Sequence, residues 1–164
     1  MSPSPFAGAF MPEEECSGKV AQANECLFCK MIKGEENCHK LYEDETTLCI
    51  LDVAQVITEE GKFVQGRSLV IPKRHVTWFY ELEDEEAGQL FIAAKNLAGK
   101  IKRAFNTEFV VMFIRGQRIP HAHIILQPSS QGDPIDNMFT SLIGHFKVVP
   151  EETLHDMARK IREV

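Results

Sequence analysis

The chain has 164 residues, about the size of one domain. Hydrophobic residues make up 44% and charged residues 26%, a balance typical of a globular protein with its own core. The formal net charge of −6 argues against attachment to nucleic acid through a basic surface, so we expect no nucleic-acid partner. The apolar run Phe6–Met11 is too short to span a bilayer and has no basic flank typical of a signal peptide. We therefore expect a cytoplasmic protein with no membrane partner.

Cysteines and histidines are the most informative reactive residues. An odd number of cysteines argues against a secreted disulfide framework, and the chain has five: Cys16, Cys26, Cys29, Cys38 and Cys49. In a reducing compartment a close pair such as Cys26-x-x-Cys29 is more often a metal or redox site than a disulfide. The natural co-ligands are the six histidines: His39, His75, His121, His123, His145 and His155.

The first half of the chain predicts an arm, a short helix and two strands. Residues 1–24 are rich in Ser, Pro, Gly and Glu without periodicity, so we expect a disordered arm. A short helix is predicted over Cys26–Lys33, ended by a glycine. Strands are predicted over Thr47–Val53 and Ser68–Ile71, with a turn or hairpin extension over Thr58–Gly66 between them.

The second half contains the clearest helical pattern. Asp84–Phe105 has an apolar stripe at 3.6-residue spacing, with acidic residues in its first turn and basic residues in its last. A pair of strands is predicted next, Phe109–Ile114 and Ile119–Leu126, around the turn Arg115–Arg118. A final helix is expected from Pro150. Several strands around one long helix indicate an α+β domain.

The stretch Ile119–Pro128 reads IPHAHIILQP and points to a functional site. Because side chains alternate along a strand, every second residue from Ala122 forms an apolar face, and His121 and His123 point together to the other face. Imidazole serves both as a metal ligand and in catalysis, so one histidine of the pair can bind metal while the other does chemistry. An ordinary polar strand face is the alternative, and it is more typical of one histidine than of two.

Further motifs agree with this stretch in order and approximate spacing. Gly116–Ile125 reads GQRIPHAHII, and the other blocks are Cys26–Glu35, Leu41–Asp44, Leu51–Val53 and Leu69–His75. Through this set the chain resembles the histidine triad (HIT) family of nucleotide-binding proteins, hydrolases and transferases. Members of that family carry His-φ-His-φ-His-φ-φ on a strand.

The resemblance implies an α+β, HIT-like fold. We expect an antiparallel sheet of about five strands with one long helix, a short N-terminal helix and a C-terminal helical extension. The HIT domain would cover residues 25–130, and an extension over residues 131–164 would pack on the domain or on a dimer partner. A homodimer is expected, because family members commonly pair through the long helix and a strand.

The resemblance also implies a purine nucleotide ligand and a reaction at its α-phosphate. His123 matches the histidine that attacks phosphorus and forms a nucleotidyl-histidine intermediate, with nucleoside phosphoramidates or dinucleoside polyphosphates as substrates. Asp52 matches the carboxylate that accepts hydrogen bonds from both ribose hydroxyls. The implied nucleotide-binding residues are Leu27, Phe28, Met31, Ile50, Asp52, Val53, Gln117, Arg118 and His123.

Two departures from the family pattern concern the phosphate site. Ile125 replaces the third histidine, so the strand carries two histidines rather than three. The loop before Gly116 is shortened, and Arg118 stands where relatives commonly have Ser or Thr. Arg115 or Arg118 could bind phosphate by direct charge, and Arg118 could equally point into solvent.

Zinc is the implied cofactor, held by positions that match the zinc ligands of many bacterial HIT proteins: Cys26, Cys29, His75 and His121. Two thiolates and two imidazoles suit a closed tetrahedral structural site. Cys38 and His39 are competing ligands. A redox role for the Cys pair, or thiols without metal, are the other possibilities, although the βαβ context of a thioredoxin-like motif is missing.

Three functions therefore compete. The first is a zinc-containing nucleotide hydrolase or transferase. The second is a nucleotide-binding or regulatory module that has lost turnover, which Ile125 and the shortened loop favour. The third is a zinc-stabilised interaction protein with a vestigial nucleotide site.

Overall fold

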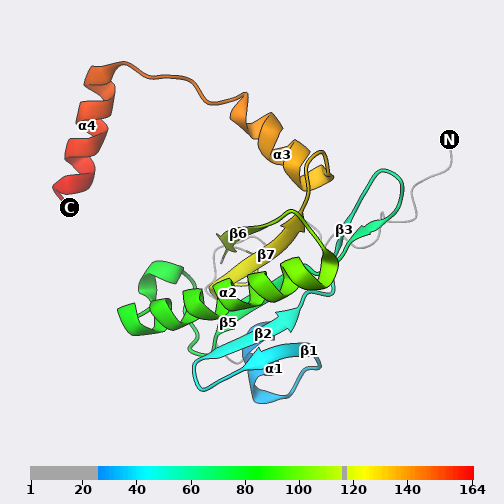
Figure 1. The fold of residues 1–164 in the computed structure, drawn as a ribbon. Coiled ribbons are helices and arrows are strands. Elements are labelled where there is room, and N and C mark those ends of the chain that lie inside the picture. Colours follow the sequence, from blue (N-terminus) through cyan, green and yellow to red (C-terminus); the bar gives the residue numbers. More distant parts are fainter. Residues whose placement is uncertain (1–25, 116–117) are drawn as a thin grey trace.

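A computed structural model describes residues 26–115 and 118–164 of the chain. Its centre is an antiparallel five-stranded sheet (Figure 1). Across the sheet the strands are β1 (His39–Glu43), β2 (Thr47–Leu51), β5 (Ser68–Pro72), β7 (His123–Ser129) and β6 (Phe109–Arg115). The predicted α+β, HIT-like architecture is confirmed. The predicted arm over residues 1–24 lies outside the described residues.

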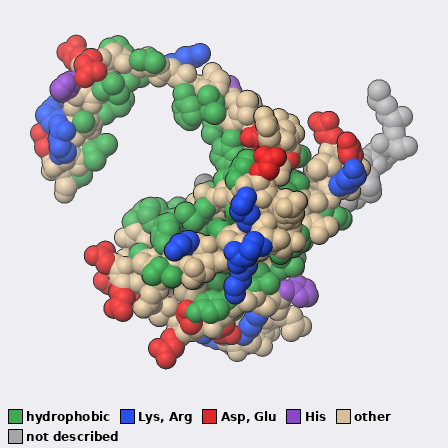
Figure 2. Space-filling model, viewed as in Figure 1, with side chains coloured by type: hydrophobic (Ala, Val, Ile, Leu, Met, Phe, Trp, Pro, Cys, Tyr) green, Lys and Arg blue, Asp and Glu red, His purple; other side chains and the backbone are tan. Residues whose placement is uncertain are grey.

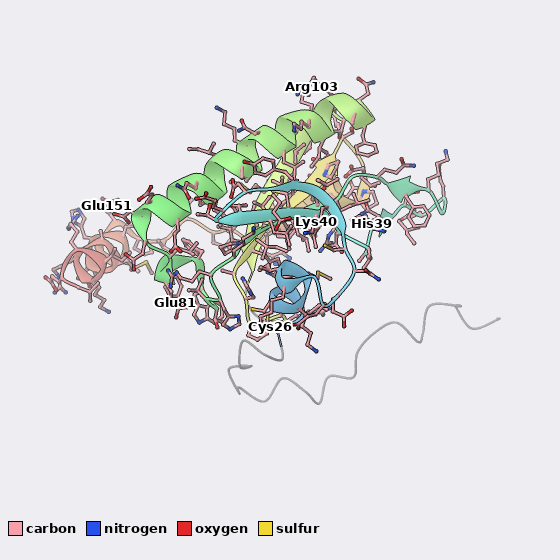
Figure 3. All side chains as sticks on the ribbon, turned by 90° about the horizontal axis from the view of Figure 1, so that it is seen from below. Cys26, His39, Lys40, Glu81, Arg103 and Glu151 are labelled. Carbon is pink, nitrogen blue, oxygen red and sulfur yellow. The ribbon has the colours of Figure 1, made fainter. Side chains whose placement is uncertain are left out.

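The two faces of the sheet carry different helices. The long helix α2 (Asp84–Phe105) covers one face, and the short helix α1 (Leu27–Lys33) lies on the other (Figures 1 and 3). The core under α2 consists of Cys49, Val70, Leu90, Ala93, Ala94, Leu97, Ile101, Ile124 and Leu126. The core under α1 consists of Cys26, Phe28, Cys29, Leu48, Ile50, Leu69, Ile71 and Ile125. Alternate residues of the central strands thus face opposite helices, as period-two patterning requires.

Helix α2 has the bounds that its sequence predicts. Its first turn holds Asp84, Glu85 and Glu86, which complement the positive end of the helix dipole. The side chain of Glu86 also accepts a hydrogen bond from the backbone of Glu83, part of a capping box. The helix ends at Asn106, whose φ of 49° lies in the left-handed region.

The segment between β2 and β5 contains an additional hairpin. Strands β3 (Val56–Ile57) and β4 (Phe63–Val64) form a separate two-stranded sheet, so the predicted hairpin extension is confirmed. The hairpin projects from the end of the main sheet in Figure 1. It returns to β5 through Gly66, whose φ is +100°. An added Cβ there would lie 2.5 Å from the ring of Phe105 and 3.3 Å from that of Pro128.

The predicted histidine strand has the wrong bounds. Strand β7 begins at His123 rather than Ile119, so His121 lies in the segment that leads into the strand. The strand also continues to Ser129 through Pro128. Strand β5 begins at Ser68, opposite Leu126, so beyond Leu126 strand β7 pairs on one side only, where proline is tolerated.

Three of the described elements were not predicted. Strand β1, the single-turn 3₁₀ helix η2 (Phe79–Glu81) and helix α3 (Pro134–Ile143) are additional elements. Helix α4 (Glu151–Arg162) is the predicted final helix, with Pro150 as its N-cap rather than its first helical residue.

The two C-terminal helices extend away from the sheet. Asp133 caps α3 by accepting hydrogen bonds from the backbone N–H groups of Ile135 and Asp136. Helix α4 has no buried residue, and its apolar side chains face the rest of the molecule across open space (Figure 2). None of the described helices combines the length and apolarity needed to cross a membrane.

Gly66→Ala is expected to destabilise the protein by about 1–3 kcal/mol, because alanine must adopt a positive φ and its Cβ meets the Phe105 ring. Gly61→Ala is the control, since Gly61 has a φ of +78° but nothing within 4 Å of an added Cβ. Urea denaturation measures both. Equal losses in the two variants would show that the close approach at Gly66 has no cost.

Candidate functional site

Cys26, Cys29, His75 and His121 come together from three separate segments. Cys26 is the N-cap of α1 and Cys29 lies in its first turn. Both belong to the core on the side of the sheet away from α2, where Figure 3 labels Cys26. His75 follows β5, and His121 precedes β7. One donor atom from each residue lies within 4.8 Å of all the others.

The spacing of these donors suits a tetrahedral metal ion. Nδ1 of His121 lies 3.4 Å from Sγ of Cys26 and 3.6 Å from Sγ of Cys29. Nδ1 of His75 lies 3.3 Å from Sγ of Cys29 and 3.3 Å from Nδ1 of His121. Tetrahedral Zn²⁺, with bonds of about 2.3 Å to sulfur and about 2.0 Å to nitrogen, separates its ligand atoms by about 3.3–3.8 Å. The four residues could therefore hold a metal ion.

The hydrogen bonds of His121 select the nitrogen that faces this group. Nε2 of His121 lies 2.8 Å from the carbonyl oxygen of Pro72, which can only accept, so Nε2 carries the proton and Nδ1 carries the lone pair. The ring is fully buried, and this burial lowers the pKa of His121 to about 4. A neutral imidazole with its lone pair directed at two thiols is the form that binds metal.

The four described cysteines differ in their surroundings, and of these Cys26 and Cys29 belong to this group. Burial raises the pKa of the Cys29 thiol to about 11, so in the absence of a cation this thiol keeps its proton at neutral pH. Cys38 and His39, the competing ligands, line a separate pocket. Cys49 is buried beneath α2, as expected of a strand thiol. All four described cysteines are free.

That separate pocket has a volume of about 370 Å³ and lies between α1 and the sheet. Its walls come from α1, from the end of β2, from the start of β5 and from β7. The residues that line it are Leu27, Phe28, Met31, Asn37, Cys38, His39, Ile50, Leu51, Asp52, Val53, Arg67, Leu69, Arg118, Ile119, His123 and Ile125.

His123 is oriented by the backbone next to it. Its Nδ1 lies 2.8 Å from the carbonyl oxygen of His121, so Nδ1 donates its proton and the lone pair resides on Nε2. The ring of Phe28 contacts that of His123 edge-on, with 5.0 Å between centroids. The side chain is 8% exposed and lines the pocket. His123 is thus held in the tautomer of a nucleophile.

Asp52 lies at another part of the same pocket, directly after β2. Its Oδ1 accepts a hydrogen bond of 2.9 Å from the backbone N–H of Ala54, and its Oδ2 accepts one of 2.8 Å from Nε of Arg67. The carboxylate is therefore ion-paired and oriented.

Eight of the nine predicted nucleotide-binding residues line this pocket, and Gln117 lies outside the described residues. Val53 is 88% exposed, so it forms only the rim. Arg118 is also exposed and lines the pocket from the segment before β7. Ile125 is 2% exposed and forms an apolar wall of the pocket, at the position of the third histidine in the family pattern.

Sequence reasoning missed Arg67 as a residue of the pocket. Arg67 lies two residues before Leu69, and both line the pocket. The alternation of strand side chains would therefore have placed Arg67 on the face of β5 that carries Leu69.

The sequence is similar to a known protein family and to several of its members. The model of the HIT domain matches residues 33–130. The protein hit of Bacillus subtilis is 37% identical over 140 residues, which span 79% of this chain and 88% of that protein. An adenylylsulfatase of Arabidopsis thaliana is 30% identical over 80% of this chain and 70% of its own length. An adenosine 5'-monophosphoramidase of Schizosaccharomyces pombe is 32% identical over 65% of this chain and 77% of its own length.

Solved structures of HIT proteins have a similar fold. A HIT family protein from Bacillus anthracis has a TM-score of 0.67 and 30% identity, covering 87% of this chain and 98% of its own. A zinc-bound histidine triad family protein from Mycobacterium smegmatis shares the fold, with a TM-score of 0.59, 24% identity, and coverage of 69% of this chain and 81% of its own. The family model covers more than half of the chain, so the protein belongs to the HIT family.

Proposed function

We propose that the protein binds a purine nucleotide and cleaves the bond between its α-phosphate and a leaving group, releasing a nucleoside monophosphate. Nucleoside phosphoramidates and dinucleoside polyphosphates are the proposed substrates. The observation that carries the proposal is the 2.8 Å contact between Nδ1 of His123 and the carbonyl of His121, inside a pocket that also contains Asp52. Two relatives named for cleaving adenylyl compounds support it.

The pocket has the complementary groups for each part of a nucleotide. Leu27, Phe28, Met31 and Ile50 supply an apolar surface for the base. The Asp52 carboxylate accepts from the ribose hydroxyls. His123, from β7, then lies against the α-phosphate.

His123 is proposed to react through its Nε2. The lone pair of Nε2 forms a bond to the α-phosphorus as the bond to the leaving group breaks, and the leaving group takes the bonding electrons and a proton from solvent. The imidazole becomes cationic, and the carbonyl of His121 stabilises this charge through the bond from Nδ1–H. Water then attacks phosphorus, the P–N bond breaks, and Nε2 recovers its lone pair.

Charge at the phosphate would come from arginine rather than from a third histidine. Ile125 offers no hydrogen bond to the phosphate, so this chain lacks the donor of its relatives at that position. Arg118 lines the pocket on the segment before His123. A guanidinium there can bind phosphate oxygens with two N–H donors.

A nucleotide-binding module with little turnover is the second candidate. The buried, apolar Ile125 favours it, because an oxygen of the phosphate that faces this side chain finds no donor. Binding of the base and ribose would be unaffected. Turnover by the wild-type protein distinguishes the two candidates.

We propose that Cys26, Cys29, His75 and His121 hold Zn²⁺. The donor spacing and the tautomer of His121 support this assignment. When bound, zinc would supply cross-links between α1, the segment after β5 and the segment before β7, with no open position for water. The proton of Cys29 would be released on binding.

A homodimer is proposed on the free edge of the sheet. Strand β6 is an edge strand of seven residues with the apolar sequence FVVMFI, whereas the opposite edge strand β1 carries Lys40 and Glu43. Long apolar edges pair with other strands unless they are protected. Met112 is exposed on this edge. The C-terminal extension, with its open apolar helix face, is proposed to pack on the partner.

His123→Ala is expected to lower AMP release from adenosine 5'-phosphoramidate by roughly a thousandfold, because the covalent step is lost. Steady-state kinetics with chromatographic detection of AMP measures it. His145→Ala, which removes an exposed histidine, is the control and should retain full activity. Activity that survives in His123→Ala would contradict the proposed nucleophile.

Cys26→Ser is expected to lose bound zinc and to melt at a lower temperature than the wild type, since one thiolate ligand is removed. Elemental analysis of the purified protein measures the zinc content. Cys38→Ser is the matched control, because its thiol is half-buried outside the group. Full zinc occupancy in Cys26→Ser would show that the ligands are misassigned.

Met112→Lys is expected to convert the dimer into a monomer by placing a charge on the β6 edge. Light scattering after size-exclusion chromatography gives the mass. Leu41→Lys, on the exposed edge strand β1, serves as the control and should remain dimeric. A wild-type protein with the mass of one chain would refute the homodimer.

A further inference from the structure

We infer that Arg67 is a specificity-determining residue, which recognises the ribose cis-diol together with Asp52. The inference rests on the proposed function, since it concerns the sugar of the bound nucleotide. Arg67 lies fifteen positions after Asp52, beyond the β3–β4 hairpin, and it lines the pocket. Its Nε donates to Oδ2 of Asp52 at 2.8 Å.

The hydrogen bonds of Asp52 leave room for two hydroxyl groups. Each carboxylate oxygen can accept about two hydrogen bonds. Oδ1 accepts one from the backbone of Ala54, and Oδ2 accepts one from Arg67. One acceptor position therefore remains on each oxygen. A cis-diol supplies two O–H donors with matching spacing, one for each oxygen.

The donors of Arg67 complete this arrangement. A guanidinium has five N–H donors, and within the described residues only the Nε–H of Arg67 has a hydrogen-bond partner. A ribose hydroxyl that donates to the carboxylate can accept from the remaining N–H groups of Arg67. Each hydroxyl could then both donate and accept, so a sugar that lacks one hydroxyl loses two hydrogen bonds to charged groups.

Gln55 holds the backbone of both residues in place. Its Nε2 donates to the carbonyl of Asp52 at 2.6 Å and to the carbonyl of Arg67 at 3.1 Å. Its Oε1 accepts from the backbone N–H groups of Gly66 and Arg67, both at 3.0 Å. The backbone N–H of Asp52 also donates to the carbonyl of Arg67 at 3.0 Å. The ion pair is thus preorganised before a nucleotide binds, which reduces the entropy cost of binding.

This arrangement predicts a selectivity that neither residue provides alone. A lone carboxylate accepts from hydroxyls but does not donate to them. With Arg67 present, a deoxyribose leaves both a carboxylate oxygen and a guanidinium N–H without a partner in the site. Sites built to bind a hydroxyl reject analogues that lack it more strongly than apolar pockets reject a missing methylene.

Calorimetric titration of the full chain with AMP, 2'-deoxy-AMP and 3'-deoxy-AMP tests the inference. The wild type is expected to bind AMP at least roughly thirtyfold more tightly than either deoxynucleotide. Arg67→Gln should weaken AMP binding by roughly tenfold and deoxynucleotide binding by less than about threefold, so that the preference for ribose shrinks. Arg67→Lys should retain part of the preference for ribose. Lys62→Gln is the control: it removes an exposed charge from the β3–β4 hairpin, outside the pocket, and should leave the affinities for all three nucleotides unchanged.

Two results would overturn the inference. In the first, Arg67→Gln weakens all three nucleotides equally, which would assign Arg67 to the phosphate or to folding. In the second, Arg67→Gln binds all three nucleotides as tightly as the wild type does. A wild type that binds none of the three nucleotides would instead overturn the proposed function, and the inference with it. Thermal melting of Arg67→Gln and Arg67→Lys checks that both variants are folded.

Discussion

The position of His121 is the constraint on which the rest of the site depends. Its ring bonds to the carbonyl of Pro72 through Nε2 and faces the thiols of the cluster through Nδ1. Its own carbonyl receives the Nδ1 proton of His123. One residue thus joins the metal-ligand group to the tautomer of the proposed nucleophile. Because both rings are anchored to backbone carbonyls of the sheet and of its entry segment, the chemistry of His123 depends on how firmly this segment is held.

The two faces of the sheet differ in their relation to the pocket of His123, because only the core under α1 shares residues with its lining. Under α2 the strands contribute Val70, Ile124 and Leu126 to an apolar core that shares no residue with the pocket of His123. Under α1 the alternate residues, such as Leu69 and Ile125, form both core and pocket wall. Substitutions in the core under α2 are therefore expected to change stability without changing the lining of that pocket. On the α1 face, residues such as Leu69 and Ile125 belong to both the core and the pocket lining, so a substitution there can change the proposed nucleotide pocket while the fold is kept.

Local patterns predicted α2 to the residue, because its apolar stripe and its terminal charges act within one segment. Alternation likewise placed His123 and Ile125 on one face of β7. It also placed His121 on that side, where Phe28 contacts both histidine rings, but the predicted strand began too early, because His121 lies in the segment before the ladder. Strand β1 has five exposed residues and no apolar alternation, so hydrophobic patterning does not predict it. The Asp52–Arg67 pair depends on β2–β5 pairing, and sequence spacing alone cannot show it.

Metal binding and nucleotide binding are expected to be interdependent, because the segment that carries His121 also orients His123. The most direct test is the affinity for AMP, measured by calorimetry on one preparation before zinc removal, after removal by a chelator, and after zinc is restored. We expect AMP binding to weaken by about tenfold or more when zinc is removed and to recover when zinc is restored. Unchanged affinity in folded protein shown to be free of zinc would contradict it.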